Sequence, residues 1–372
     1  ITASAGTSNF RAGVNAGNSI ESGGDYNTVV GDEAGTAITT GDSNVALGYG
    51  AFKTSTIGYN SVIIGTNAGD AITTSGQNIL IGFDSGTTLT TGGDNTAVGD
   101  RSFKLATTAA NSVAIGGTAL ENTTTGSNNV GVGWGSLRAN TTASNNTAVG
   151  TSALYANTTG TNNVALGSSA GAALTTGSSN ILIGSNTGDA LTTANENTAV
   201  GHFSMSNNVL GAKNVAIGTS TLSSTNPVSA TDMYNVAVGF QAGTAVTTGV
   251  QNTLIGAEAG DAITTASYNT AVGQGSLGST TTGINNTAVG RTSLFVNTTG
   301  TQNVAIGMDA LQQNSTGSQN TAVGRSALIT NTTASNNTAL GYAALGANTT
   351  GTHNAAVGAL ALDANIGGHD DT

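Results

Sequence analysis

The chain has 372 residues, of which 19 are acidic and 8 are basic, giving a net charge of −11. This charge, with Lys and Arg scattered singly, argues against a nucleic-acid partner, because nucleic-acid-binding proteins present basic stripes. There is no cysteine, which excludes disulfides and thiolate metal sites. No apolar run approaches the ~18 residues of a membrane-spanning segment.

The first 26 residues fit no regular pattern, and we expect residues 1–26 to form an irregular N-terminal cap or a junction to an upstream segment. The chain opens at Ile1 without a methionine or a signal peptide. This opening is typical of a mature product or an excised fragment.

Residues 27–358 repeat one motif, which is Asn, three aliphatic or Thr residues, and then Gly. The closing glycine recurs at every seventeenth residue, as in Gly133, Gly150 and Gly167, with a single longer interval from Gly218 to Gly239. Self-similarity at a short fixed period is the signature of a solenoid, in which each repeat is one coil stacked on its neighbours. The sequence therefore predicts an all-β fold, a β-solenoid (β-roll) of about 20 coils. Low charge and few aromatic residues would also suit disorder, but disordered tracts need no such strict placement of aliphatic residues.

We number each coil from its Asn, so that the coil starting at Asn146 has Asn146 at position 1 and Gly150 at position 5. Position 4 is always Val, Ile or Leu, position 2 is Val, Ile or Thr with one Ala, and position 3 is mostly Ala. Such residues between Asn and Gly predict a short strand. Positions 2 and 4 then share one face of the strand and position 3 takes the other. Both faces are apolar, so one lines the interior and the other needs cover from a second layer or from partner chains, as in a multi-chain solenoid.

The second half of the coil has two versions. In one, a large residue at position 9 accompanies a polar residue at position 12, as in Leu154 with Asn157. In the other, position 9 is Gly and position 12 is aliphatic, as in Gly188 with Leu191, and position 3 tends to be bulkier. We interpret these as two ways of filling one core volume. Thr-Thr at positions 13 and 14, followed by Gly or Ala, predicts a turn, so we expect two short strands and two turns in each coil.

Two segments depart from the repeat. The interval from Gly218 to Gly239 has four extra residues and contains the only proline, Pro227. Insertions in solenoids map to loops on one face, so we expect residues 225–231 to bulge outward as a tolerated loop or as a ligand-contacting one. Residues 359–372 lose the pattern and are expected to form a frayed tail or another junction.

Stacked coils place equivalent residues in rows. Position 1 is Asn in all but two coils, where Ser61 and Ser112 replace it. A row of Asn can hydrogen-bond from side chain to side chain and to the turn backbone of the next coil. We expect a structural ladder formed by Asn27, Asn44, Asn78, Asn95, Asn129, Asn146, Asn163, Asn180, Asn197, Asn214, Asn235, Asn252, Asn269, Asn286, Asn303, Asn320, Asn337 and Asn354.

No set of residues in the sequence has the spacing of a catalytic or metal site. The histidines, His202, His353 and His369, lie far apart, and no nucleophile, base and orienting acid cluster along the chain. We therefore expect no enzyme activity, no cofactor and no metal. Two glycosidase-type carboxylates meeting across coils stay an alternative.

Three aspartates follow Gly at position 10, namely Asp70, Asp189 and Asp261. They lack the Gly-Gly-x-Gly-x-Asp pattern of calcium-binding rolls. Several Asn-Thr-Thr triplets match the glycosylation sequon, but in a chain this rich in Asn and Thr they arise without selection. The sequons begin at Asn140, Asn157, Asn297, Asn331 and Asn348.

Two features of the repeat have a structural interpretation and, as an alternative, a binding one. The Thr-Thr rows resemble the threonine ranks with which several antifreeze proteins meet ice, although those proteins typically use Thr-x-Thr on one strand face. Aromatic residues such as Tyr49, Tyr155, Phe295 and Tyr342 are able to stack on sugars or, equally, to pack at the rim of the coils.

The repeats also resemble those of a known class of fibres. Asn162 to Ala170, N-N-V-A-L-G-S-S-A, and Asn111 to Ala119, N-S-V-A-I-G-G-T-A, look like the head repeats of YadA-like trimeric autotransporter adhesins. The unit N-T-A-V-G-T-S-A-L-Y-A-N-T-T-G-T-N from Asn146 is similar to repeats of phage tail fibres, many of which end in an endosialidase-type chaperone domain. The resemblance covers about residues 27–358. It implies a left-handed, homotrimeric β-roll displayed outside a cell or on a virion, although the adhesin repeat is usually shorter than the one in this chain.

These observations together predict a non-enzymatic extracellular fibre, either an adhesin head or a phage tail-fibre shaft, located at a cell surface or on a virion. Its expected partners are two further copies of the chain and a cell-surface glycan or protein receptor. A self-assembling structural filament and an ice-binding solenoid that uses the Thr-Thr rows are the two alternatives.

Overall fold

The computed structural model describes residues 6–371, so residues 1–5 of the expected cap and Thr372 of the expected tail lie outside the described residues. The described chain contains no helix, and therefore none that could cross a membrane. It divides into two compact units, unit 1 ending at Asn180 and unit 2 beginning at Ile181, which are described separately below.

Every coil contributes one short strand, and unit 2 has two shorter strands in addition, one in its long coil and one in the coil before it. The strands of unit 1 are β1 (Phe10–Ala12), β2 (Thr28–Val30), β3 (Val45–Leu47), β4 (Val62–Ile64), β5 (Ile79–Ile81), β6 (Thr96–Val98), β7 (Val113–Ile115), β8 (Val130–Val132), β9 (Thr147–Val149) and β10 (Val164–Leu166). Those of unit 2 are β11 (Ile181–Ile183), β12 (Thr198–Val200), β13 (Gly211–Ala212), β14 (Val215–Ile217), β15 (Thr231–Asp232), β16 (Val236–Val238), β17 (Thr253–Ile255), β18 (Thr270–Val272), β19 (Thr287–Val289), β20 (Val304–Ile306), β21 (Thr321–Val323), β22 (Thr338–Leu340) and β23 (Ala355–Val357).

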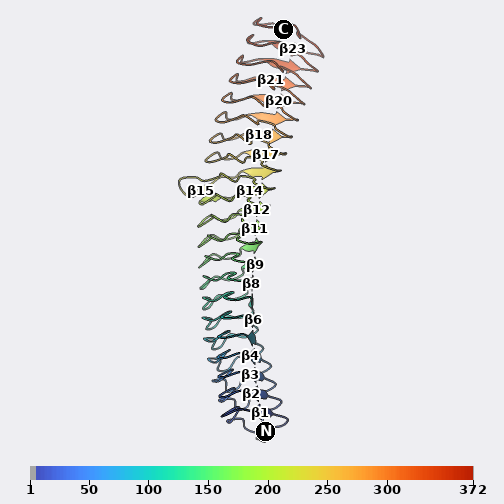
Figure 1. Ribbon diagram of the computed structural model, residues 1–372. Helices are drawn as coiled ribbons and strands as arrows, with labels where there is room; N and C mark the ends of the chain where they lie inside the picture. Colours follow the sequence, from blue (N-terminus) through green and yellow to red (C-terminus); the bar gives the residue numbers. More distant parts are fainter. Residues whose placement is uncertain (1–5, 372) are drawn as a thin grey trace. The chain divides into compact units, whose positions relative to one another are not determined.

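Within each unit the strands of successive coils pair in parallel and in register, as the ribbon shows (Figure 1). Ala148 in β9 pairs with Ala165 in β10, and Ala271 in β18 pairs with Ala288 in β19, each one repeat later. The prediction of an all-β parallel solenoid of about 20 turns with a 17-residue repeat is confirmed.

Apart from β13 and β15, the second halves of the described coils contain no strand, and the expectation of two strands in each coil is wrong. Residues at positions 7, 9 and 17 take left-handed backbone conformations, as shown by Ser152 (φ 56°), Leu154 (φ 49°) and Asn162 (φ 59°). Left-handed residues interrupt the extended conformation that a strand requires. Coil-to-coil hydrogen bonds persist through this half without a strand, for example from Leu154 N–H to the carbonyl of Ala170 at 3.0 Å.

The closing glycine of the motif lets neighbouring coils approach closely at position 5. Gly150 has φ +134°, and a Cβ placed there would lie 2.4 Å from the carbonyl oxygen of Gly167. Only glycine combines this φ with such an approach of two backbones. The column of glycines at position 5 is therefore required for neighbouring coils to stack this closely.

The core lies inside the coils and is built from position 3 together with position 9 or 12. Ala148, Leu154 and Leu182 are fully buried, so position 3 faces inward and positions 2 and 4 face outward. In the Gly version, a Cβ on Gly188 would lie 2.7 Å from Leu191 Cδ1 and 2.9 Å from Leu182 Cδ2. The aliphatic residue at position 12 and the bulkier position 3 thus occupy the space that Leu takes at position 9 in the other version. This explains why the residues at positions 3, 9 and 12 change together from one version to the other.

Both ends of the described chain continue the coil path. Residues 6–26, expected to be irregular, form a further coil in which Phe10 pairs with Thr28 and Arg11 pairs with Val29. This coil is one residue longer than the next, in which Thr28 pairs with Val45, and the extra residue hid it from the periodicity. Residues 359–371, expected to be a frayed tail or a junction, also stack on the preceding coil, with Ala355 N–H donating to the carbonyl of Asp371 at 2.8 Å.

The long coil of unit 2 extends its turn outward. Residues 226–230 form a loop that leads into β15 (Figure 1). Within this loop Pro227 is buried and Val228 is 96% exposed. The loop ends in β15, which pairs in parallel with β13 of the coil before it, Gly211 with Thr231 and Ala212 with Asp232.

Candidate binding surfaces

The position-1 asparagines form a buried ladder within each unit. The side-chain Oδ1 of one Asn accepts the backbone N–H of position 1 in the next coil, and its Nδ2 donates to the position-15 carbonyl in the turn that leads into that coil. For Asn146 these bonds run from Asn163 N–H at 2.9 Å and to the Gly160 carbonyl at 2.9 Å. In unit 2, Asn303 N–H donates to Asn286 Oδ1 at 3.0 Å. A fully buried amide with both ends bonded holds the coils together and leaves nothing for a ligand.

The two serines of this row keep half of the ladder. Ser61 Oγ accepts the N–H of Asn78 at 3.3 Å, and Ser112 Oγ accepts that of Asn129 at 3.2 Å. A hydroxyl is too short to reach the turn carbonyl of the next coil as well, and it instead donates to a carbonyl two residues back along the chain, from Ser61 to Tyr59.

A second asparagine ladder at position 12 was not predicted. Asn157 Nδ2 donates to Asn140 Oδ1 at 3.3 Å, and in unit 2 Asn331 Nδ2 donates to Asn314 Oδ1 at 2.8 Å. The sequence did contain evidence for this ladder, because Asn-Thr-Thr triplets recur one repeat apart, as at Asn140 and Asn157. We compared the triplets only with the glycosylation sequon and did not consider them as a row. These sequon asparagines, Asn140, Asn157, Asn297, Asn331 and Asn348, are fully buried, so in the folded chain their amides are enclosed by the coils.

The Thr-Thr rows present only one outward rank. Thr141 Oγ1, at position 13, donates to the carbonyl of Thr158 in the next coil at 3.1 Å, and Thr298 does the same to Ser315 at 3.0 Å. Their neighbours Thr142 and Thr299, at position 14, are exposed. The first hydroxyl of each pair is therefore committed to stacking the coils.

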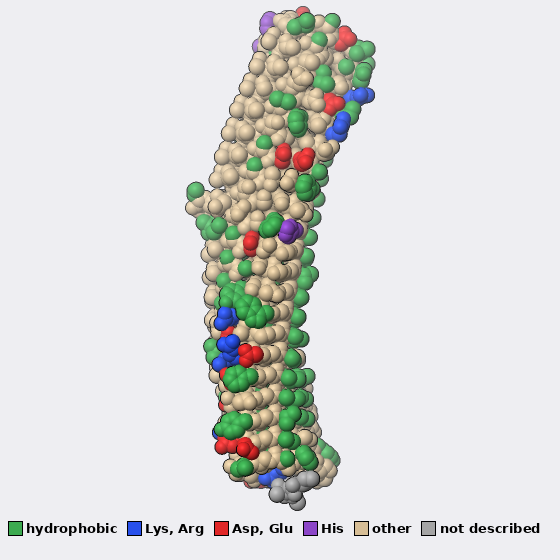
Figure 2. All heavy atoms as spheres, viewed as in Figure 1, with side chains coloured by type: hydrophobic (Ala, Val, Ile, Leu, Met, Phe, Trp, Pro, Cys, Tyr) green, Lys and Arg blue, Asp and Glu red, His purple; other side chains and the backbone are tan. Residues whose placement is uncertain are grey.

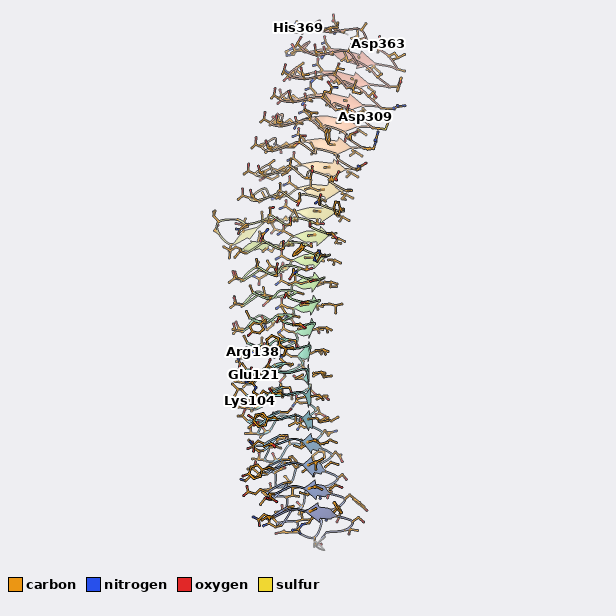
Figure 3. All side chains as sticks on the ribbon, in the orientation of Figure 1. Lys104, Glu121, Arg138, Asp309, Asp363 and His369 are labelled. Carbon is orange, nitrogen blue, oxygen red and sulfur yellow. The ribbon has the colours of Figure 1, made fainter. Side chains whose placement is uncertain are left out.

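The sequence candidates for a metal site do not come together in the structure. Across residues 6–371, no three His, Cys, Asp or Glu side chains gather as a metal site requires. His369 lies at the C-terminal end of unit 2 (Figure 3), where its Nδ1 accepts the N–H of Thr352 at 3.0 Å. Burial raises the pKa of Asp70, Asp189 and Asp261, and a second negative charge adds to the rise at Asp70 and Asp261.

The outward face of the strands, formed by positions 2 and 4 and here named the outer strand face, carries Val, Ile or Leu at position 4 of every coil between residues 27 and 358, and Val, Ile, Thr or one Ala at position 2. Position 4 side chains such as Leu47, Ile115 and Ile306 are 40–43% exposed. No charged residue occurs at positions 2 or 4 of any coil between residues 27 and 358. Figure 2 shows rows of hydrophobic side chains along the side of the molecule where the strands lie.

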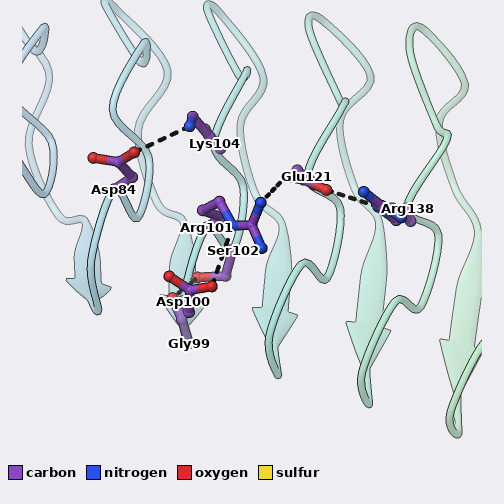
Figure 4. A network of polar contacts seen from close by, with 8 residues as sticks. All are labelled: Asp84, Gly99, Asp100, Arg101, Ser102, Lys104, Glu121 and Arg138. Atoms are coloured by element: carbon purple, nitrogen blue, oxygen red, sulfur yellow. Dashed lines mark hydrogen bonds and ion pairs between the residues drawn. The ribbon is translucent and has the colours of Figure 1, made fainter.

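A different face of unit 1, formed by positions 6, 7 and 10, carries most of the charged residues of its coils. Figure 2 shows basic, acidic and large hydrophobic side chains grouped there, and Figure 3 labels three of them, Lys104, Glu121 and Arg138. Most of the charges pair between coils rather than within one. Lys104 Nζ, for example, lies 3.0 Å from Asp84 Oδ2 in the coil before it (Figure 4).

Glu121 is the centre of this network (Figure 4). Its side chain is only 9% exposed, and it contacts Arg138 Nε at 2.7 Å and Arg101 Nη1 at 3.7 Å. Arg101 also contacts Asp100 at 3.2 Å. Two guanidinium groups thus hold one largely buried carboxylate, an arrangement that offsets its desolvation.

The network ends in two stacked aromatic rings. Arg138 Nη1 donates to the Tyr155 hydroxyl at 2.6 Å, and its guanidinium carbon lies 5.7 Å from the centre of that ring. Hydrogen bonds to Glu121 and then to Tyr155 raise the pKa of Arg138. The Tyr155 ring in turn stacks on Trp134, with centroids 6.5 Å apart and planes inclined by 23°. We name Glu121, Trp134, Arg138 and Tyr155 the aromatic patch.

Of the four aromatic residues singled out from the sequence, the structure places only Tyr155 in a stacked pair. Tyr49 and Tyr342 are exposed at position 6, and Tyr342 lies beside Arg325, whose guanidinium carbon is 6.0 Å from its ring. Phe295 occupies position 10 as Tyr155 does, but Gln274 stands where Trp134 would be. Trp134 itself was not singled out, although it stands at position 6 as Tyr49 and Tyr342 do.

A scan against models of known protein families and a search of curated proteins both give no match for this chain.

Proposed function

We propose that the chain is part of a non-enzymatic extracellular fibre, an adhesin head or a phage tail-fibre shaft, in which three copies associate and engage a cell surface. The observation that carries the proposal is the outer strand face. Parallel sheets are ordinarily covered on both faces, yet here one face lies against the core and the other presents half-exposed Val, Ile and Leu. A continuous exposed apolar surface of this kind marks an association site.

Three copies packed around a common axis would bury this surface in the middle of the assembly. The likeness of the repeats to those of trimeric adhesins and tail fibres supports three as the number of copies. Within residues 6–371 no three His, Cys, Asp or Glu side chains could together hold a metal ion, and the interior asparagines at positions 1 and 12 donate bonds that stack the coils. A shaft or head that holds and binds fits these features better than an enzyme does.

Sedimentation of the purified chain tests the proposal. The chain has a mass of 36.0 kDa, and we expect a species of three times that mass. A monomer would overturn the assembly, and long polymers would favour the self-assembling filament instead. A monomer that also produced thermal hysteresis near freezing would point to ice binding.

Two variants in one coil test whether the outer strand face is the surface at which the copies associate. Ile115→Glu places a charge on the outer strand face, where burial between copies would cost several kcal/mol, so we expect the assembly to dissociate. Thr125→Glu places the same charge at position 14 of the same coil, on an exposed turn, and should leave the trimer intact. Equal behaviour of the two variants would contradict the assignment of the outer strand face.

A further inference from the structure

We infer that the aromatic patch of unit 1 is a binding site for a neutral saccharide. The inference deepens the proposed function, on which it rests, by naming the chemical class that the fibre would recognise. It depends on four features of the patch: its exposed aromatic surface, the glycines next to the rings, its fixed polar groups and its balanced charge.

Trp134 and Tyr155 present aromatic surface from two adjacent coils. Trp134 is 53% exposed although it is stacked on Tyr155. Within the described residues its indole Nε1 has no hydrogen-bond partner, so this N–H is available to a ligand. The C–H-rich face of a pyranose packs on such rings, while its hydroxyl groups seek donors and acceptors at their edge.

Two glycines allow the rings to lie against the backbone. A Cβ on Gly135 would be 3.3 Å from the Tyr155 ring, and one on Gly117 would be 3.4 Å from Trp134 Cδ1. Each ring is therefore supported from below by main chain. Rings held in this way lose little conformational freedom when a ligand binds, which favours affinity.

The polar groups beside the rings are fixed before any ligand arrives. Arg138 is held at Nε by Glu121 and at Nη1 by the Tyr155 hydroxyl, at 2.7 and 2.6 Å. Glu121 is held from its other side by Arg101. Because Arg138 retains further N–H groups and its side chain is 34% exposed, it can donate to a saccharide hydroxyl without leaving its partners.

The charge of the network selects a neutral ligand. Asp84, Asp100 and Glu121 are balanced by Arg101, Lys104 and Arg138, and each basic group already contacts an acidic one. The patch thus offers no unpaired positive charge to a sialylated or uronic-acid glycan. A hexose or N-acetylhexosamine chain matches both the rings and the balanced polar rim.

The test uses Trp134, the only tryptophan in the chain, as its own reporter. The full chain is titrated with maltohexaose, cellohexaose, N-acetylchitohexaose and, for comparison, anionic hexagalacturonate, while tryptophan emission is recorded. We expect a saturable change with at least one neutral oligosaccharide, with Kd between about 0.1 and 10 mM. No saturable change with any neutral oligosaccharide, or saturation with the anionic one alone, would overturn the inference.

Variants distinguish saccharide binding by the aromatic patch from a general effect of changing a side chain in a coil. Tyr155→Ala should weaken binding at least about tenfold, and Tyr155→Phe, which keeps the ring and loses the hydroxyl, should weaken it less. Phe295→Ala is the matched control, because Phe295 has the same coil position and lies beside Gly275 and Gly278, but it is in neither of the two ring pairs found among residues 6–371. The control should bind like the parent chain; full binding by Tyr155→Ala would overturn the inference.

Sedimentation of the same samples keeps the two proposals apart. Saccharide binding by a monomer would contradict the trimer and leave the patch standing. A trimer that binds no neutral oligosaccharide would contradict the patch and leave the fibre standing. Circular dichroism of Tyr155→Ala verifies that the coils are folded, and the titration of the parent chain decides the matter independently of any variant.

Discussion

The backbone N–H of Asn163 donates to the side-chain Oδ1 of Asn146 at 2.9 Å, one coil away. Asn163 repeats the relationship with the next coil, accepting the N–H of Asn180 at 3.0 Å and donating to the carbonyl of Gly177 at 2.9 Å. One fully buried amide thus satisfies backbone groups that would otherwise be orphaned between coils.

Replacing this amide should cost stability in proportion to the bonds lost. We expect Asn163→Ala to lower the free energy of unfolding by about 1–3 kcal/mol, because it leaves buried donors and acceptors unpaired. Asn163→Ser should cost less, because Ser61 and Ser112 show that a hydroxyl still accepts the N–H of the following coil. Urea unfolding of the three proteins measures the order, and equal loss in both variants would contradict the role given to Oδ1.

The two ways of filling the core predict a rescue. In Gly260→Leu the new Cβ would meet Ile263 Cδ1 and Leu254 Cδ2, each at 2.8 Å. We expect a loss of at least about 2 kcal/mol from overpacking. Adding Ile263→Thr and Leu254→Ala should restore most of it, because the next coil has this combination, with Leu277 and Thr280.

Thermal unfolding of the single and triple variants tests the rescue. The pair Ile263→Thr and Leu254→Ala without the leucine serves as the control, and it should be destabilised by the cavity it leaves. A triple variant no more stable than either parent set would show that the two versions are not interchangeable.

The glycine column predicts a large effect from a single methyl group. Gly150→Ala would combine an unfavourable φ of +134° with a Cβ only 2.4 Å from the carbonyl oxygen of Gly167. We expect a loss of at least about 2 kcal/mol. Gly93→Ala is a milder comparison, because its Cβ would meet one carbonyl oxygen at 3.1 Å and its φ is not in the left-handed region. Similar melting temperatures for the two variants would contradict the close-approach argument.

The raised pKa of Asp189 predicts how the stability of the folded chain changes with pH. Burial raises the pKa of its carboxyl above the ordinary value, so the folded chain holds this proton to higher pH than the unfolded chain does. Its contribution to stability is then favourable below the unfolded pKa of about 3.9 and is lost as the pH rises through the raised folded value. We expect Asp189→Asn to raise the melting temperature at neutral pH and to change it little at about pH 3.

The control for this prediction is Asp363→Asn, which changes an exposed carboxylate at the same coil position in the same unit. Its melting temperature should follow that of the parent chain at both pH values. If Asp189→Asn were neutral or destabilising at neutral pH and stabilising only in acid, the sign would be wrong.

The repeat, the strand at positions 2–4 and the opposite direction of position 3 from positions 2 and 4 could be predicted from the sequence, because they depend on periodicity and on the alternation of strand side chains. The sequence left open which of the two faces points inward, and burial in the structure assigns position 3 to the core. The missing second strand could not, since the left-handed conformations of Ser152 and Leu154 are set by how the coil closes and not by residue preference. The coil before Asn27 was missed because it is one residue longer than the repeat.

The aromatic patch lay beyond the sequence argument for a related reason. Trp134 and Tyr155 occupy positions 6 and 10 of adjacent coils, so they share no column. Their contact depends on the path of the turn between strand and core, which a repeat length alone does not specify. The crowding of charges at positions 6, 7 and 10 was visible in the sequence and would have located the face.

The long coil of unit 2 has a consequence for how the chain finds its native pairing. Coils of nearly identical sequence can pair with the wrong neighbour, shifted by one repeat, and such mispairing is a hazard of folding in repeat proteins. The parallel pair of β13 with β15 has no equivalent elsewhere in the described chain, so only the correct neighbour satisfies it. This one coil, which differs from its neighbours, therefore fixes which coil of unit 2 pairs with which on either side of it.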